Sequence, residues 1–128
     1  MTALRGEHLA AMHLSHRGYE ILARNVRTSA GEIDLIARRG EVLAFVEVKT
    51  ARIRRADGAG ATPDRRPLES LRYRQRVRIR RAAAAWLREG GSEQPSAGPA
   101  STLRFDAIGV VLDARWQLLR IDHIEAAW

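Results

Sequence analysis

Cysteine is absent from the 128 residues of this chain, which excludes a disulfide framework and any thiolate metal site. The N-terminus lacks the apolar stretch of a signal peptide, and no hydrophobic window approaches the length of a membrane span. These absences favour a reducing cytoplasm and a chain without membrane-embedded segments. The length suits one domain, residues 1–128, and the 45% of hydrophobic residues can supply a single modest core.

Lysine is almost absent as well. Of the 22 basic residues, 21 are arginine, and the single exception is Lys49. A guanidinium is a planar, permanently charged fork, whereas an ammonium is a compact point charge that can gain and lose a proton. Because arginine serves wherever any cation would do, the lone lysine points to a chemical role at its own position.

Lys49 stands at the end of an apolar run. Residues 41–49 are β-branched and apolar up to their last three positions, which predicts a strand buried on both faces. Side chains alternate along a strand, so Glu47 and Lys49 share one face. By itself, this pattern is equally compatible with an ion pair where the strand emerges into solvent.

A second strand is predicted just upstream, over residues 32–38, where acidic and aliphatic residues alternate. If the intervening hairpin turn is centred near residues 39–41, the two strands are antiparallel and Asp34 lies opposite or diagonal to Glu47. Glu32 shares the face of Asp34, so the register alone does not choose between them. Unpaired charges are costly to desolvate, and a metal ion would neutralise this acidic cluster.

A helix predicted over residues 2–17 adds a further carboxylate. Glu7 interrupts its apolar stripe, so the helix directs an acid towards the core. A surface glutamate at the margin of a narrow stripe is the alternative interpretation. The rest of the stripe consists of Ala3, Leu4, Ala10, Ala11 and Leu14.

Three features taken in chain order resemble the YraN-like family of small bacterial proteins: Glu7, GEIDLIA at residues 31–37 and FVEVKT at residues 45–50. That family is similar to the PD-(D/E)XK nuclease superfamily, in particular to the archaeal Holliday-junction resolvases. The resemblance covers most of the chain, including residues 104–108 and 121–128. The proline that gives the superfamily its name is replaced here by Ile33.

The resemblance implies a site for Mg²⁺ or Mn²⁺. In the superfamily, the residues that match Asp34 and Glu47 bind the ion through their carboxylates, and the backbone carbonyl that matches Val48 adds a ligand. The resemblance further implies that Lys49 assists the attacking water and that Glu7 completes the site. Hard oxygen ligands suit these ions, which also bind phosphate oxygens. An amine can orient or deprotonate water, a role closed to an arginine.

Positive charge is concentrated in one third of the chain. Residues 50–88 carry a net charge of +9, whereas residues 1–49 carry +1 and residues 89–128 carry −3. This concentration favours phosphate binding over a merely solvated basic face. Contacts with nucleic acid are expected from Arg52, Arg54, Arg55, Arg72, Arg74, Gln75, Arg76 and Arg80.

Much of this charge lies on a helix predicted over residues 67–88. Arg72, Arg76 and Arg80 line one face of it, next to the apolar stripe that faces the sheet. Gln75 lies on the stripe itself, where it either reaches the acidic site or caps the apolar surface. The full stripe is Leu71, Gln75, Ile79, Ala82 and Trp86.

The predicted fold is α/β, a central mixed β-sheet flanked by helices. Its αβββαβ core with an added C-terminal strand is the restriction-endonuclease-like arrangement that the resemblance implies. The strand after the long helix can return parallel to a central strand. The expected elements are a helix at 2–17, strands near 19–27, 32–38 and 41–49, a helix at 67–88, and strands near 102–112 and 115–121.

The leading functional hypothesis is a metal-dependent DNA endonuclease that acts in repair or recombination. Aromatic residues make up only 5% of the chain, which favours duplex or branched DNA over single strands as the substrate. A catalytically inactive nucleic-acid-binding protein that uses the Arg-rich segment 52–81 is one alternative, and an adaptor that docks an acidic protein is another. A homodimer is expected by analogy with resolvases, which need two active sites on a symmetric junction.

Overall fold

A computed structural model describes residues 2–53, 73–90, 100 and 102–128. Its elements confirm the predicted α/β class and the predicted order of helices and strands. No helix in the described ranges is long and apolar enough to cross a membrane. In chain order, the elements are α1 (Thr2–His16), β1 (Glu20–Thr28), β2 (Gly31–Arg39), β3 (Val42–Arg52), α2 (Tyr73–Arg88), β4 (Thr102–Leu112) and β5 (Leu118–Ile124).

The strands form one five-stranded mixed sheet in the order β1-β2-β3-β4-β5. Strands β3 and β4 are parallel, as predicted for a strand that returns after the long helix, and all other neighbours are antiparallel. Parallel neighbours need a crossover connection, and α2 lies in the one that joins β3 to β4. The parallel pair runs from Val42 beside Thr102 to Arg52 beside Leu112, so β3 is held along its full length in the middle of the sheet.

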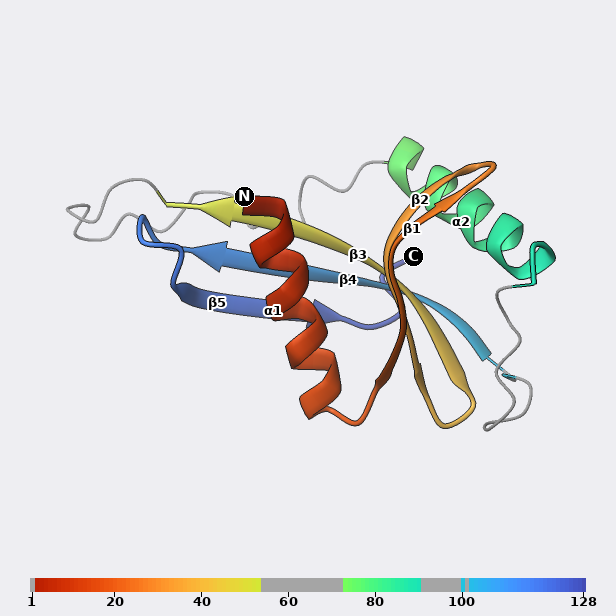
Figure 1. The fold of residues 1–128 in the computed structure, drawn as a ribbon, viewed down its shortest axis with the longest axis horizontal. Helices are drawn as coiled ribbons and strands as arrows, with labels where there is room; N and C mark the ends of the chain where they lie inside the picture. The colour runs from red at the N-terminus through yellow and green to blue at the C-terminus, as the bar shows by residue number, and fades with distance from the viewer. Residues whose placement is uncertain (1, 54–72, 91–99, 101) are drawn as a thin grey trace.

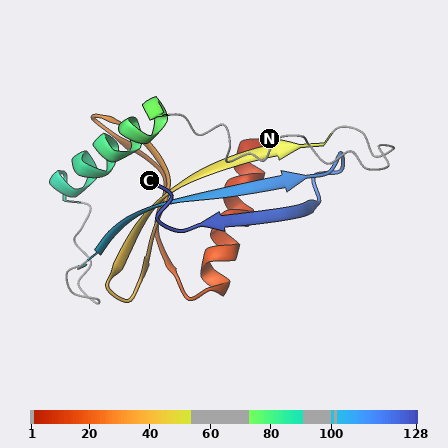
Figure 2. The ribbon, with the colours of Figure 1, turned by 180° about the vertical axis from the view of Figure 1, so that it is seen from behind.

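The two helices cover different parts of the sheet. Helix α1 lies across one face, whereas α2 lies at one end, alongside the β1–β2 hairpin (Figure 1, Figure 2). Val46 and Val48 join the core under α1, while Phe45 joins the core under α2. Because side chains alternate along a strand, Glu47 and Lys49 point to the α2 face, as Phe45 does.

The first helix packs largely as predicted. Ala10, Ala11 and Leu14 are fully buried against the sheet, which confirms the predicted apolar stripe. The prediction was wrong for Leu4, whose side chain is 57% exposed. Leu4 lies in the first turn of α1.

The last strand begins later than predicted. The segment before it, from residue 113 to residue 117, is a turn rather than the start of a strand. Asp113 Oδ1 accepts hydrogen bonds from the backbone N–H groups of Arg115 at 2.7 Å and Gln117 at 2.9 Å. An aspartate that hydrogen-bonds the backbone just after it is a common turn device. Strand β5 therefore starts at Leu118, not at residue 115.

The other boundaries differ by a few residues. Strand β3 continues to Arg52 because its parallel pairing with β4 extends that far, beyond the predicted end at residue 49. Helix α2 is described from Tyr73 onward, and the predicted first part of this helix, residues 67–72, lies outside the described residues.

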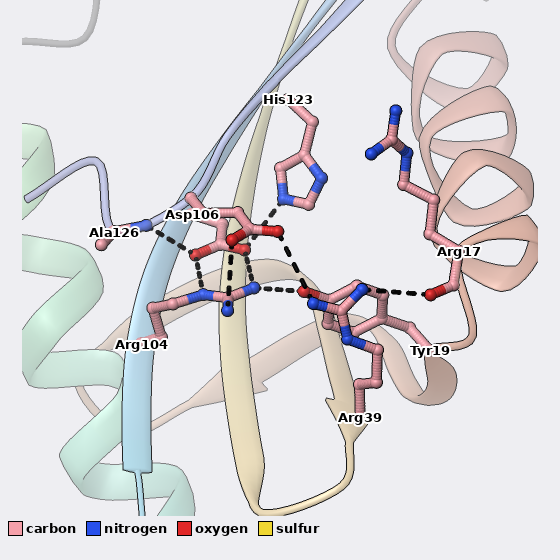
Figure 3. Close-up of polar contacts among 8 residues, drawn as sticks. Arg17, Tyr19, Arg39, Arg104, Asp106, His123 and Ala126 are labelled. Atoms are coloured by element: carbon pink, nitrogen blue, oxygen red, sulfur yellow. Dashed lines mark hydrogen bonds and ion pairs between the residues drawn. The ribbon is translucent and has the colours of Figure 1, made fainter.

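A buried carboxylate anchors the C-terminal part of the chain. Asp106 on β4 is fully buried and engaged in four hydrogen bonds (Figure 3). Nε and Nη2 of Arg104 each donate to it at 2.8 Å, and His123 Nε2 lies 2.9 Å from its Oδ2. The fourth donor is the backbone N–H of Ala126, 3.1 Å from Oδ1. Arg104 also hydrogen-bonds the hydroxyl of Tyr19, so the network joins the start of β1 to β4 and β5.

These partners outweigh the effect of burial. Burial alone would raise the pKa of Asp106, but the hydrogen bonds from His123 and Arg104 and the charge of Arg104 lower the pKa to about 2. Asp106 is therefore a structural carboxylate, charged throughout the physiological pH range. The network was not predicted, because Tyr19, His123 and Ala126 lie far from Asp106 and Arg104 in the chain.

We expect Asp106→Asn to lower the free energy of unfolding by about 3–5 kcal/mol, because it removes the buried charge that holds both Arg104 and His123 and leaves Arg104 with only the half-exposed Glu125, 3.6 Å away, as an ion-pair partner. In the native chain, the stabilisation from Asp106 is complete above the usual pKa of 3.8 and is lost as the pH falls through about 2. Urea unfolding between pH 6 and pH 2.5 measures both effects. A variant as stable as the native chain at pH 6 would contradict the assignment.

Candidate active site

Two neighbouring strands part where the acidic motif lies. The ladder between β2 and β3 ends at Leu35 opposite Val46, although β2 continues to pair with β1 as far as Gly31. The next positions in this register are Asp34 and Glu47, which agrees with the predicted hairpin register. Beyond this point the β1–β2 hairpin bends away from β3 towards α2 (Figure 1, Figure 2).

The side chain of Asp34 bonds the backbone of β3 just beyond the point where the β2–β3 ladder ends. Asp34 Oδ2 accepts a hydrogen bond of 2.8 Å from the backbone N–H of Val48. In a strand, the N–H and C=O groups of one residue point to the same neighbour. The carbonyl of Val48 therefore also faces the opening between β2 and β3, which is where the sequence analysis expected it to act.

Glu47 and Lys49 form a pair on the α2 face of β3. Lys49 Nζ lies 3.7 Å from Glu47 Oε1, and the two side chains are only 24% and 17% exposed. The pair is thus not the solvent-exposed ion pair that was the alternative interpretation. Burial of this degree holds the ammonium at a fixed position beside the acidic cluster.

Glu7 reaches the same cluster from α1. Helix α1 approaches β3 closely at Gly6, where an added Cβ atom would lie 1.8 Å from Thr50 Oγ1. Glu7 Oε2 is buried and has no hydrogen-bond partner in the described part of the chain. Asp34 and Asn25 lie close enough to change its pKa. Asn25, which was not predicted, adopts a left-handed conformation in β1 with φ of 49°.

All three acids favour the protonated state more than free carboxyl groups do. Burial, with the neighbouring Asp34 carboxylate, raises the pKa of Glu47 to about 8, against the opposing effect of Lys49. Burial also raises the pKa of Asp34, although its hydrogen bond from Val48 opposes the change. Burial and the charge of Asp34 raise the pKa of Glu7. The charged form of the cluster is therefore unfavourable, and a bound cation would stabilise it.

A cavity of about 310 Å³ opens beside this cluster. Asp34 and Glu47 form part of its wall, and Gln75 reaches it from α2, which is one of the two placements that the sequence left open. Glu32 lies at its rim, mostly exposed and 3.3 Å from Arg27, so the geometry favours Asp34 as the functional acid. The lining residues are Gly31, Glu32, Asp34, Glu47, Gln75, Arg78 and Ile79.

The arginines of α2 are placed only partly as expected. Arg74, Arg76 and Arg80 are exposed, and their contacts with nucleic acid stay a prediction. Arg80 lies over the ring of Phe105, with Cζ 4.7 Å from the ring centroid. Arg78, which lines the acidic cavity, was not among the predicted residues; its helical position next to the stripe was the only signal of this.

The remaining basic candidates lie elsewhere. Arg52 lies over the ring of Trp116, 4.2 Å from Cζ to the centroid, and donates a hydrogen bond to the carbonyl of Ala114. It thus already has partners in the turn before β5. Arg54, Arg55 and Arg72 lie outside the described residues.

The donor set suits a hard cation. No group of three or more histidine or acidic side chains is arranged as a metal centre within the described residues. Mg²⁺ is usually held by one or two carboxylates, with water and substrate phosphate supplying the other ligands. Asp34 and Glu47 meet that requirement, and the partnerless oxygen of Glu7 provides a further donor close by.

We predict that, without added metal, the free energy of unfolding falls as the pH rises from about 4.5 to about 8, because the unfolded chain releases the Glu47 proton first. Glu47→Gln should flatten this fall and stabilise the chain at pH 8.5 by at least about 1 kcal/mol. Urea unfolding of both proteins at pH 5 and pH 8.5, with chelator present, measures the difference. Equal pH profiles would show that Glu47 titrates normally.

Known proteins resemble the chain over nearly its full length. A family model described as "Uncharacterised protein family UPF0102" matches residues 6–110. A UPF0102 protein of Nocardia farcinica is 42% identical over 96% of this chain and 85% of its own length. Relatives from Paramagnetospirillum magneticum and Chlorobaculum tepidum are 45% and 41% identical, over 95% and 96% of this chain and 82% and 88% of their own lengths. The chain therefore belongs to the uncharacterised protein family UPF0102, to which the name YraN-like also refers.

Proposed function

We propose that this protein is a metal-dependent nuclease that hydrolyses phosphodiester bonds in duplex or branched DNA. The observation that carries the proposal is the pair of partly buried carboxyl groups, Asp34 and Glu47, beside the only lysine of the chain and at the wall of an open cavity. Two carboxylates brought together away from water destabilise the fold unless a cation binds between them. This arrangement therefore indicates a functional role for the two acids, not a role in stability.

The cation proposed for this site is Mg²⁺ or Mn²⁺. Asp34, Glu47 and the carbonyl of Val48 would hold it, with Glu7 as a further donor. Such an ion, when bound, would lower the pKa of water and stabilise the charge that develops on a phosphoryl group. The partnerless oxygen of Glu7 and the raised pKa values of all three acids support this assignment, because both are relieved by positive charge.

Lys49 is proposed to orient the attacking water and take up its proton. Glu47 holds the ammonium 3.7 Å away, on the face of β3 that carries the acids. An amine can exchange a proton during the reaction, whereas an arginine at this position would keep its charge. Across the cavity, Arg78 and Gln75 are placed to contact phosphate oxygens.

The resemblance of the sequence motifs to Holliday-junction resolvases supports a role in DNA repair or recombination. A homodimer would then supply two active sites for a symmetric junction. The second candidate is a protein that binds DNA through its arginines and does not cleave it. The charge of +9 between residues 50 and 88 favours this candidate as much as it favours the nuclease. Binding does not separate the two candidates, but cleavage does.

We predict that the native chain cleaves DNA in Mg²⁺ or Mn²⁺ and that Asp34→Ala and Lys49→Ala each lower the rate by about 10²-fold or more. Linear duplex, flapped and four-way-junction DNA should be compared, each with a chelator control. Lys49→Arg is the matched control: it keeps the charge beside Glu47 and should restore binding without restoring cleavage. Tight binding without cutting by any of these proteins would favour the binding-protein candidate.

We further predict that Mn²⁺ binds more tightly as the pH rises through about 8, because the ion must displace the proton that Glu47 otherwise retains. Calorimetry in buffers of different ionisation enthalpy should detect proton release, and the ion should raise the melting temperature of the native chain. Glu47→Gln should abolish both effects, whereas substituting the exposed Glu20 should leave them unchanged. Equal binding by native chain and Glu47→Gln would remove Glu47 from the ligand set.

A further inference from the structure

A second groove lies beside the acidic cavity. It has a volume of about 320 Å³ and lies between the tip of the β1–β2 hairpin and one flank of α2. Arg78 belongs to the walls of both the groove and the acidic cavity, so the two are contiguous. The groove is lined by Ala30, Tyr73, Arg74, Val77, Arg78 and Arg81.

The arginines of this groove share one side of the helix. Arg74, Arg78 and Arg81 are spaced at i, i+4 and i+7, which places them in a row along α2. Arg76 and Arg80 lie on the opposite side, where Arg80 contacts Phe105 of β4. Of the two basic flanks of α2, only the one with Arg74, Arg78 and Arg81 continues into the acidic cavity.

The hairpin is shaped to receive Arg78. Gly31 has φ of 144°, and an added Cβ atom would lie 3.3 Å from Arg78 Cγ. The missing side chain lets the stem of Arg78 lie against the hairpin backbone, between the cavity and the groove that it lines. Within the described residues, none of Arg74, Arg78 and Arg81 has an ion-pair partner. Their charges are therefore available to an anionic ligand.

An aromatic ring lies at the end of the groove. Tyr73 is 78% exposed, an unusual position for a large aromatic side chain in a chain with few aromatics. An exposed ring beside a row of arginines combines base stacking with phosphate contacts, the two devices by which proteins hold a nucleic-acid strand. A protein partner with acidic side chains would use the arginines but has no base to stack on the ring.

We propose that this groove binds the strand segment next to the scissile phosphate, with Arg74, Arg78 and Arg81 on successive phosphates and Tyr73 on a base. The inference rests on the proposed function only in taking the acidic cavity as the place where the strand is cut. At 1.5 Å per helical residue, the three arginines span about 10.5 Å. A DNA strand carries one charge per 3.4 Å of its axis, so the row spans about three intervals between phosphates, enough for each arginine to contact a different one.

The test compares the two flanks of α2 in the full chain. Arg74→Ala with Arg81→Ala removes two charges from the groove, and Arg76→Ala with Arg80→Ala removes two from the opposite flank. The affinity for flapped DNA is measured in a salt series, without metal, and thermal unfolding shows that each variant is folded. The Arg74→Ala, Arg81→Ala double variant should lower the affinity for DNA at least tenfold and flatten the slope of log affinity against log salt by about 2. The Arg76→Ala, Arg80→Ala double variant should have a much smaller effect on both.

The proposed base contact has its own control. Tyr73→Ala should weaken binding of flapped DNA about tenfold but leave the affinity for heparin, a polyanion without bases, unchanged. Equal losses for DNA and heparin, or no loss for either, would overturn the base contact. Equal effects from the two arginine pairs, or a larger effect from Arg76 and Arg80, would overturn the phosphate track.

Cleavage assays separate this inference from the proposed function. If the Arg74→Ala, Arg81→Ala double variant binds DNA more weakly, but the native chain cuts no substrate with any metal, the groove proposal stands and the nuclease proposal fails. If the native chain cleaves DNA with metal and this double variant cleaves it equally well, the nuclease proposal stands and the groove proposal fails.

Discussion

The hydrogen bond from the Val48 N–H group to Asp34 is the contact on which the site depends. It forms where β2 and β3 stop pairing, and it gives the exposed edge of β3 an acceptor without closing the gap. Strand β3 stays in the sheet here because β4 pairs with it through to Arg52. The sheet thus parts on one side of β3 only, and the opening exposes the carboxyl groups of Asp34 and Glu47 to one cavity, with Lys49 beside Glu47.

Two acidic side chains of this chain have opposite chemistry. Asp106 is engaged in four hydrogen bonds, and its pKa is about 2 despite complete burial. Glu47 is only partly buried but has another carboxylate as its neighbour, and its pKa is about 8. The fold can therefore stabilise a buried acid where it has a structural role. At Asp34 and Glu47 the pKa is raised instead, which indicates that a bound ligand supplies the stabilisation that the fold does not.

Local patterns were enough to predict much of this arrangement. The alternation of residues 41–49 and the turn near Gly40 determined which side chains share a face and which acids lie opposite one another. The positions of Asn25 and of the Asp106 partners were not predictable, because they depend on contacts between residues far apart in the chain. The predicted basic face of α2 had the correct spacing, but the sequence could not show which flank of the helix meets the hairpin, since that depends on how the sheet bends.

The bend of the β1–β2 hairpin links the acidic and basic parts of the surface. By leaving β3, the hairpin opens the acidic cavity, and by reaching α2, it places Gly31 against Arg78 and forms the wall of the groove. Arg78 shares the cavity with Asp34 and Glu47, yet among the described residues it forms no ion pair with either. Opposite charges that face one cavity without pairing are arranged for a ligand that has both signs, and a phosphodiester that carries a divalent cation is such a ligand.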